Sequence, residues 1–168
     1  MANKTVGILG GMGPEATVDL MSKIIRATPA KTDQEHIRLL VDNNPQIPSR
    51  IDAILEGGEN PGPVLVEMAK GLEKWGAEML VIPCNTAHYF IQHVLDAVSI
   101  PVVNMIEETV QVIVASGIKN IALLATTATV KTKLYEEKLA QAGMELILPT
   151  SEFQEEIMRA IYGVKAND

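Results

Sequence analysis

The chain has 168 residues, of which 47% are hydrophobic, enough for one domain with a substantial core or for two small ones. Asp and Glu number 21 against 14 Lys and Arg, and the formal net charge of −7 argues against nucleic acid or an anionic membrane as a partner. The single cysteine excludes an intramolecular disulfide, and no apolar run approaches the about 18 residues of a membrane span. We therefore expect a cytoplasmic protein that acts in a reducing compartment.

The first hundred residues alternate short apolar runs with amphipathic stretches. The apolar runs predict four strands, at 6–9, 37–41, 79–82 and 100–103. Helices are expected at 14–27, 62–75 and 87–98, with a short helical piece near 49–55 in a segment rich in Pro and Gly. Continuous apolar strands that alternate with helices predict a parallel sheet covered on both faces.

The remaining residues repeat the order of strand, polar turn and helix. After a helix at 106–116, strands are expected at 120–125 and 144–148, and helices at 129–142 and from 151 to about 163. The sequence thus predicts an α/β fold of Rossmann or flavodoxin type with two lobes, residues 1–105 and 106–168. Two strands cannot bury both of their own faces, so we expect the second lobe to be incomplete and to expose apolar surface.

The only cysteine, Cys84, stands where the third predicted strand turns into a helix. A helix that begins near Ala87 would direct free N–H groups and the positive end of its dipole at this turn, which favours a thiolate. Asn85 or Thr86 can cap that helix. The turn predicts a catalytic base or nucleophile, although a free cysteine can equally be a small buried hydrophobic residue.

Polar turns follow several of the predicted strands, and in a parallel sheet such turns meet at one edge, where ligands bind. The first turn, 11–16, fits the relaxed G-x-G-x-x-A fingerprint of dinucleotide sites, with Asp42 as the acidic residue after the second strand. The same glycines could instead present backbone N–H groups to a carboxylate, or serve only as a tight turn. A dinucleotide-binding domain is therefore one alternative for the function.

Other polar residues permit several interpretations. Arg50 could bind a substrate carboxylate through its forked guanidinium group, or be a solvated loop residue. The threonines at 126, 127 and 129 could line an anion site or cap a helix. His88 and His93 do not have the spacing of a zinc site with Cys84, and nothing in the sequence orients His88 as a base. No lysine has a setting typical of a pyridoxal Schiff base, so no metal and no cofactor are predicted.

Five stretches together resemble the aspartate/glutamate racemase family, the pyridoxal-independent amino-acid racemases. They read GGMGPEAT at 10–17, NPQIPSR at 44–50, PCNTAH at 83–88, LATTATVKT at 124–132 and IYGVK at 161–165. The similarity covers essentially the whole chain, and although no single motif is decisive, their joint occurrence is specific.

This resemblance implies two pseudo-symmetric lobes with the active site between them, no cofactor, and frequent dimers. It implies two thiols on opposite faces of the substrate α-carbon, of which Cys84 would be one. The substrate would be a small dicarboxylic amino acid, aspartate or glutamate. The residues that would bind it by resemblance are Met12, Gln46, Arg50, Asn85, Thr86, Thr127 and Lys165.

The chain departs from the family pattern in one important respect. Family members carry the second thiol in a Gly-Cys-Thr motif on a later strand of the second lobe, and this chain has no second cysteine. We therefore expect that the C-terminal part with that thiol is absent and that two-thiol racemisation is impaired. A dicarboxylate-binding protein without catalysis, or a second base from a partner subunit, are the alternatives.

Overall fold

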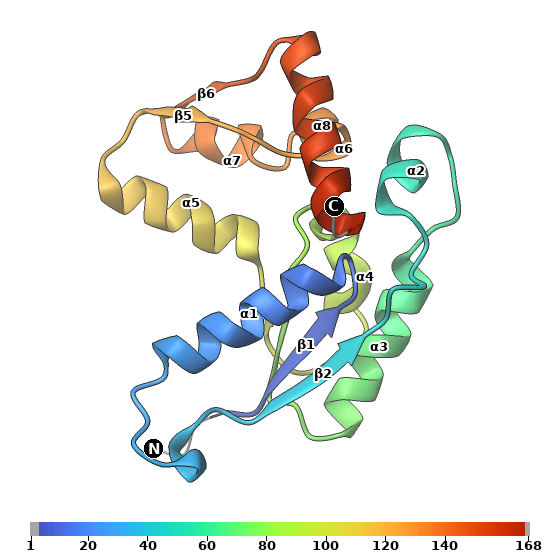
Figure 1. Cartoon of the computed structure of the whole chain (residues 1–168), viewed down its shortest axis with the longest axis vertical. Helices are drawn as coiled ribbons and strands as arrows, with labels where there is room; N and C mark the ends of the chain where they lie inside the picture. The colour runs from blue at the N-terminus through green and yellow to red at the C-terminus, as the bar shows by residue number, and fades with distance from the viewer. Residues whose placement is uncertain (1–3, 167–168) are drawn as a thin grey trace.

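The computed structural model describes residues 4–166 and shows an α/β fold with two parallel sheets (Figure 1). The larger sheet has the strand order β2-β1-β3-β4. Its strands are β1 (Val6–Gly10), β2 (Leu39–Asn43), β3 (Met79–Val81) and β4 (Val102–Val103). Because β1 lies between β2 and β3, all five of its residues are buried, which explains its continuous apolar sequence.

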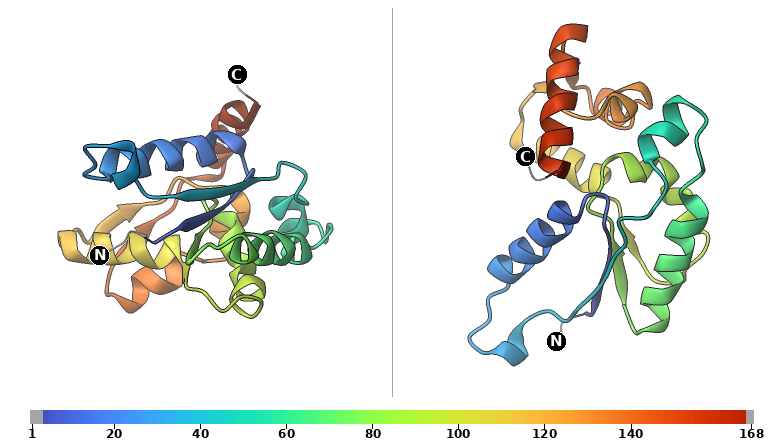
Figure 2. Two further views of the ribbon diagram at one scale, coloured as in Figure 1. Left: turned by 90° about the horizontal axis from the view of Figure 1, so that it is seen from below. Right: turned by 45° about the vertical axis from the view of Figure 1, so that its right-hand side comes forward.

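Helices cover both faces of this sheet, as the alternating pattern predicts. α1 (Pro14–Ala27) lies on one face and α3 (Gly62–Lys74) on the other (Figure 2). Leu65, Met68 and Leu72 recur at helical spacing in α3 and are buried in the core. The remaining elements of this part are short, namely η1 (Asp33–Glu35), α2 (Arg50–Leu55), η2 (Thr86–Phe90) and α4 (Ile91–Leu95).

The second sheet has two parallel strands, β5 (Asn120–Ala122) and β6 (Glu145–Ile147). The same part of the chain contains α5 (Met105–Ser116), α6 (Thr127–Lys131), α7 (Glu136–Gln141), which packs on β6, and α8 (Ser151–Ala166). The buried core of this part consists of Ile106, Tyr135 and Leu139 and is much smaller than the first. The fold class is confirmed, and we propose that the two lobes divide at residue 105, the first residue of α5.

Apolar side chains are exposed on the second part, as expected for a small sheet. Val112, Leu124 and Ile147 are 70%, 66% and 51% exposed. None of the helices within residues 4–166 combines the length and the apolar character needed to cross a bilayer.

Several predicted boundaries are wrong. The single helix expected at 87–98 is the 3₁₀ helix η2 followed by α4, which ends at Leu95. The helix expected at 129–142 is divided into α6 and α7 by a turn in which Lys133 has φ 55°. In both places, buried side chains that bind other parts of the chain outweigh local helix preference.

The last helix does not end near residue 163. Gly163 lacks the positive φ that ends a helix at Gly117 and Gly143, so α8 continues through it to Ala166. This continuation places Lys165 on the final turn of α8 rather than in a tail.

Candidate active site

A pocket of about 530 Å³ lies beyond the carboxyl ends of β1 and β3. The chain leaves β1 for β2 on one side and returns to β3 on the other, and ligands bind at such a switch point in open α/β sheets. The pocket lies between the two sheets, because both parts of the chain contribute to it. Its lining comes from residues 12–16, 83–86, 124–126 and 129, and from 157, 160, 161, 164 and 165.

The glycines after β1 are explained by close packing. Gly11 has φ 94°, its N–H donates a 3.0 Å hydrogen bond to Oγ1 of Thr17, and a side chain at this position would collide with the backbone of Asn44. Pro14 occupies the first position of α1 and has no N–H to offer a phosphate. Asp42 does not line the pocket; burial, and then the nearby Glu67, raise the pKa of its carboxyl group. The geometry therefore gives no support to the dinucleotide interpretation.

Cys84 is half-buried and lines the pocket three residues after the end of β3. The long α-helix expected behind it is instead five residues of 3₁₀ helix followed by the short α4. Neither Asn85 nor Thr86 caps the 3₁₀ helix through its side chain. The cap and the dipole of a long helix are thus wrong predictions. Both side chains instead bind the second part of the chain.

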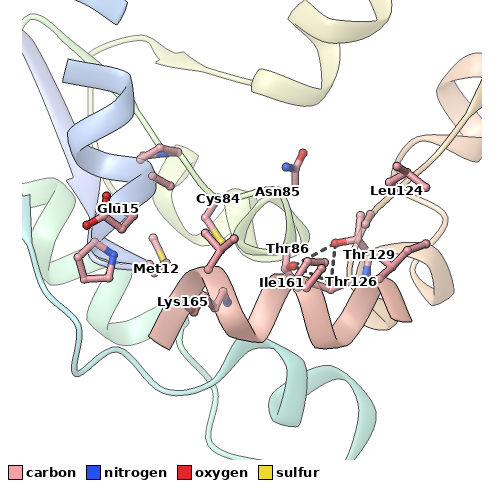
Figure 3. A pocket seen from close by; sticks show the side chains of 18 residues that line it. Met12, Glu15, Cys84, Asn85, Thr86, Leu124, Thr126, Thr129, Ile161 and Lys165 are labelled. Carbon is pink, nitrogen blue, oxygen red and sulfur yellow. Dashed lines mark hydrogen bonds between the residues drawn. The ribbon is translucent and has the colours of Figure 1, made fainter. Parts of the chain in front are cut away.

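Three threonine hydroxyls form a triangle at the inner end of the pocket. The Oγ1 atoms of Thr86, Thr126 and Thr129 lie 3.0 Å apart in each pair (Figure 3). Thr86 is 5% exposed and Thr129 fully buried. Because Thr86 follows β3 and the other two belong to α6 and its cap, this hydrogen-bonded triangle joins the two parts of the fold.

His88 is buried beneath the same turn and does not bind the thiol of Cys84. Its Nδ1 lies 2.8 Å from the carbonyl oxygen of Cys84, and its Nε2 accepts a 3.1 Å hydrogen bond from the N–H of Met105. Burial lowers the pKa of the His88 ring. Among residues 4–166 no cluster of three or more His, Cys, Asp or Glu side chains could hold a metal ion.

One face of α8 forms a wall of the pocket. Ile157, Ala160, Ile161, Val164 and Lys165 have the i, i+3, i+4, i+7, i+8 spacing of a single helical face. The helix is fixed at its start by the amide of Gln154, whose Nε2 donates a 2.9 Å hydrogen bond to the carbonyl of Ala125. An apolar wall therefore carries one cationic side chain at its end.

The pocket brings together five of the eight site residues predicted from the sequence. They are Met12, Cys84, Asn85, Thr86 and Lys165. Gln46 is exposed and does not line the pocket, and Oγ1 of Thr127 accepts a 3.3 Å hydrogen bond from Gln154. Arg50 also lies outside the lining, where its Nη1 donates to the carbonyls of Ile47 at 3.0 Å and Pro48 at 2.8 Å. The roles assigned to these residues stay predictions.

Sequence reasoning missed the contributions of Glu15, Leu124 and the α8 face, whereas it had named Thr126 and Thr129 as a possible anion site. The apolar spacing of α8 is visible in the sequence and could have identified the wall as an amphipathic face. Its direction toward Cys84 depends on how the two sheets are placed, which no local pattern encodes.

Three comparisons with known proteins agree. The family model described as Asp/Glu/Hydantoin racemase matches residues 9–168. The structure of Picrophilus torridus aspartate racemase is 39% identical, with a TM-score of 0.91, over 99% of this chain and 70% of that one. An aspartate racemase homologue from Pyrococcus horikoshii OT3 is 28% identical, with a TM-score of 0.74, over 95% of this chain and 70% of that one.

A curated relative gives the same result. The broad specificity amino-acid racemase RacX of Bacillus subtilis (strain 168) is 30% identical over 146 residues, which are 84% of this chain and 63% of that protein. The chain thus spans less than two thirds of the length of RacX. With its fold, its pocket and these matches together, the chain belongs to the Asp/Glu/hydantoin racemase family.

Proposed function

We propose that the chain acts on a small dicarboxylic amino acid as a cofactor-independent enzyme of the aspartate/glutamate racemase type, with Cys84 as one of the two proton-transfer groups that racemisation needs. One observation carries this proposal: the only cysteine lines the pocket at the β1/β3 switch point, opposite an apolar helix face that ends in Lys165. The family and the aspartate racemase likeness point to the same substrate class.

Binding would use the few polar groups of the pocket. Lys165 is exposed at the pocket end of α8 and has no hydrogen bond or ion pair among the described residues, so it can receive a substrate carboxylate. Asn85 and Thr86 would contact the other polar groups, and Met12 would pack on the carbon chain. Arg50, Gln46 and Thr127 lie outside the pocket, and a role for them requires a movement of their side chains toward it.

The chemical step is a proton transfer at the α-carbon. The thiolate of Cys84 takes the α-proton, the C–H electron pair stays on the substrate, and the resulting charge spreads into the adjacent carboxylate. No electron sink assists this step, so preorganised donors at that carboxylate must supply the stabilisation. A proton returned by Cys84 restores the original enantiomer, whereas a proton from a group on the opposite face completes racemisation.

With one cysteine, the chain can address only one face of the α-carbon through a thiol. We therefore propose that it exchanges the α-hydrogen of one enantiomer with retention, and that racemisation is impaired unless a second acid reaches the opposite face. A dicarboxylate-binding protein without catalysis is the second candidate, and the single thiol is the observation in its favour.

The test follows the α-hydrogen of L- and D-aspartate, and then of L- and D-glutamate, by proton NMR in D₂O. We expect the α-proton signal of one enantiomer to disappear. The variant Cys84→Ala should show no exchange, whereas the matched variant His93→Gln, on the exposed side of α4, should exchange at the wild-type rate. Saturable binding of aspartate without exchange would favour the binding protein. Binding of NAD in place of aspartate would restore the dinucleotide alternative.

A further inference from the structure

His88 is one of the few polar side chains in the core, with 3% of its surface exposed. Its two ring nitrogens have different partners. Nδ1 faces the carbonyl oxygen of Cys84 at 2.8 Å, and Nε2 faces the N–H of Met105 at 3.1 Å. The first partner belongs to the turn that carries the thiol, and the second is the first residue of α5.

These partners determine where the ring proton lies. A carbonyl oxygen only accepts, so a 2.8 Å contact with it requires a proton on Nδ1. A backbone N–H only donates, so Nε2 must present its lone pair to Met105. The ring is therefore neutral and carries its proton on Nδ1.

Both peptide groups next to the α-carbon of Cys84 are held by hydrogen bonds. The N–H of Cys84 donates to the carbonyl of Ile82 at 2.8 Å, and the carbonyl of Cys84 accepts from His88. With the backbone fixed on both sides, rotation about the Cα–Cβ bond is the main freedom left to the thiol.

The other side of the ring is equally fixed. The first N–H groups of a helix have no partner within it. In α5, Oδ1 of Asn104 accepts from Ile106 and Glu107, while Nε2 of His88 accepts from Met105. His88 is thus part of the N-terminal cap of the helix that begins the second part of the fold.

We infer that His88 is a positioning residue, which holds the backbone of Cys84 through Nδ1–H and couples it to the start of α5 through Nε2. The inference rests on the proposed function, since the position of the thiol matters only if the thiol transfers a proton. His88 itself does not touch the substrate, because it does not line the pocket.

Two variants separate the two contacts. An asparagine amide can replace Nδ1–H as the donor to Cys84 but does not reach Met105. A glutamine carbonyl can replace Nε2 as the acceptor from Met105 but leaves the carbonyl of Cys84 without its donor. His88→Asn and His88→Gln form the test pair, and the exposed His93→Gln is the control.

The kinetic readout is the rate of α-hydrogen exchange with aspartate. Displacement of a reacting group costs on the order of tenfold to a hundredfold in rate, so we expect such a loss of kcat in His88→Gln with KM little changed. His88→Asn should stay much closer to the wild-type rate. Equal losses in the two variants, or a change in KM alone, would show a general structural role and overturn the inference.

Two readouts do not depend on catalysis. In ¹⁵N-labelled protein, the ring resonances that vanish in His88→Gln must show a protonated Nδ1 and an unprotonated Nε2 at neutral pH. Alkylation by iodoacetamide reports only Cys84, the single thiol, and should be faster in His88→Gln than in wild type or His93→Gln. The opposite tautomer, or an unchanged or slower alkylation rate, would overturn the inference. If wild type exchanges no substrate, the proposed function fails, and these two readouts still decide the role of His88.

Discussion

The hydroxyl group of Tyr135 donates a 2.6 Å hydrogen bond to Oδ1 of Asn85, a residue 50 positions earlier in the chain. Tyr135 is 8% exposed and belongs to the small core of the second part, whereas Asn85 lines the pocket beside Cys84. Because the amide oxygen of Asn85 is engaged, its NH₂ group is the end left to bind a ligand. In the proposed function, Asn85 would therefore act as a donor to a substrate carboxylate.

Removal of this hydroxyl should release the Asn85 amide. We expect Tyr135→Phe to lower the free energy of unfolding by about 1 kcal/mol, the net value of a typical hydrogen bond, and to raise KM for aspartate exchange. Urea unfolding and the D₂O assay measure the two effects. Tyr162→Phe, at a residue 51% exposed on α8, is the matched control and should change neither. Unaltered stability and KM in Tyr135→Phe would show that the bond does not orient Asn85.

The threonine triangle should stabilise the contact between the two parts of the fold. Thr129→Val keeps the shape of the side chain but removes a fully buried hydroxyl that Thr86 and Thr126 both contact. We expect a loss of about 1–3 kcal/mol in urea unfolding. Thr132→Val is the control, because that hydroxyl binds only carbonyls of its own helical segment. Equal losses in the two variants would argue against a role at the junction.

The buried neutral His88 gives stability a specific pH dependence. Burial lowers its pKa below the usual 6.5, while the Cys84 and Val103 carbonyls and the Glu107 carboxylate act in the opposite direction. The unfolded chain therefore binds more protons than the folded one, and the contribution of His88, complete above about pH 6.5, is lost as pH falls through the folded pKa. The Tm values of wild type and His88→Asn, measured by thermal unfolding, should therefore become more similar as the pH falls. A constant difference between them from pH 8 to pH 5 would contradict this.

Lys165 should contribute binding rather than chemistry. Lys165→Gln removes the cation from the wall of α8, and the loss of a charged hydrogen bond corresponds to about a tenfold to hundredfold weaker affinity for aspartate. Calorimetric titration measures the affinity directly. Added salt screens the charge of Lys165 and should also lower the affinity of the wild type for aspartate. Lys119→Gln, at an exposed residue outside the pocket, serves as the comparison. Similar affinities for both variants would remove Lys165 from the site.

We also propose that the chain forms a homodimer through apolar surface of the second part. Val112, Leu124 and Ile147 of this part are 70%, 66% and 51% exposed, and exposed apolar side chains favour association. Ile147→Lys should shift the mass measured by light scattering toward the monomer. Trp75→Lys, at a residue 62% exposed on the first part, should leave the mass unchanged. A monomeric wild type with a sharp unfolding transition would refute the proposal.

Much of the fold follows from local pattern. Apolar runs identified the strands. The glycines at 76, 117 and 143, each of which directly follows a predicted helix, have φ values of 99°, 72° and 73°. Glycine adopts such values without strain, so a glycine at these positions is a local signal from which the end of a helix can be predicted. The second strand was placed about two residues too early, because Asp42 and Asn43 pair with β1 despite their polar side chains.

The candidate site was less predictable. Cys84, Thr86 and Lys165 were identified through motifs, but the 3₁₀ helix after Cys84 was not, because it depends on bonds to Thr126, Thr129 and Met105 far along the chain. Arg50 is the converse case, in which a motif predicts a site residue that the structure places outside the pocket. Its motif predicts substrate contact, and its guanidinium group binds the carbonyls of its own loop.

The α8 wall has a consequence for the choice of substrate. Successive turns of an α-helix are 5.4 Å apart, whereas aspartate and glutamate differ by one carbon, about 1.5 Å of bond length. The side chains of α8 are spaced by whole helical turns, and the lysine at the end of the wall is flexible. Contacts with this wall therefore cannot distinguish two acids that differ by one carbon in length. In the proposed racemase, discrimination by one methylene would therefore fall to the turn beside Lys165, where the backbone of Gly11 is packed against Asn44 and hydrogen-bonded to Thr17.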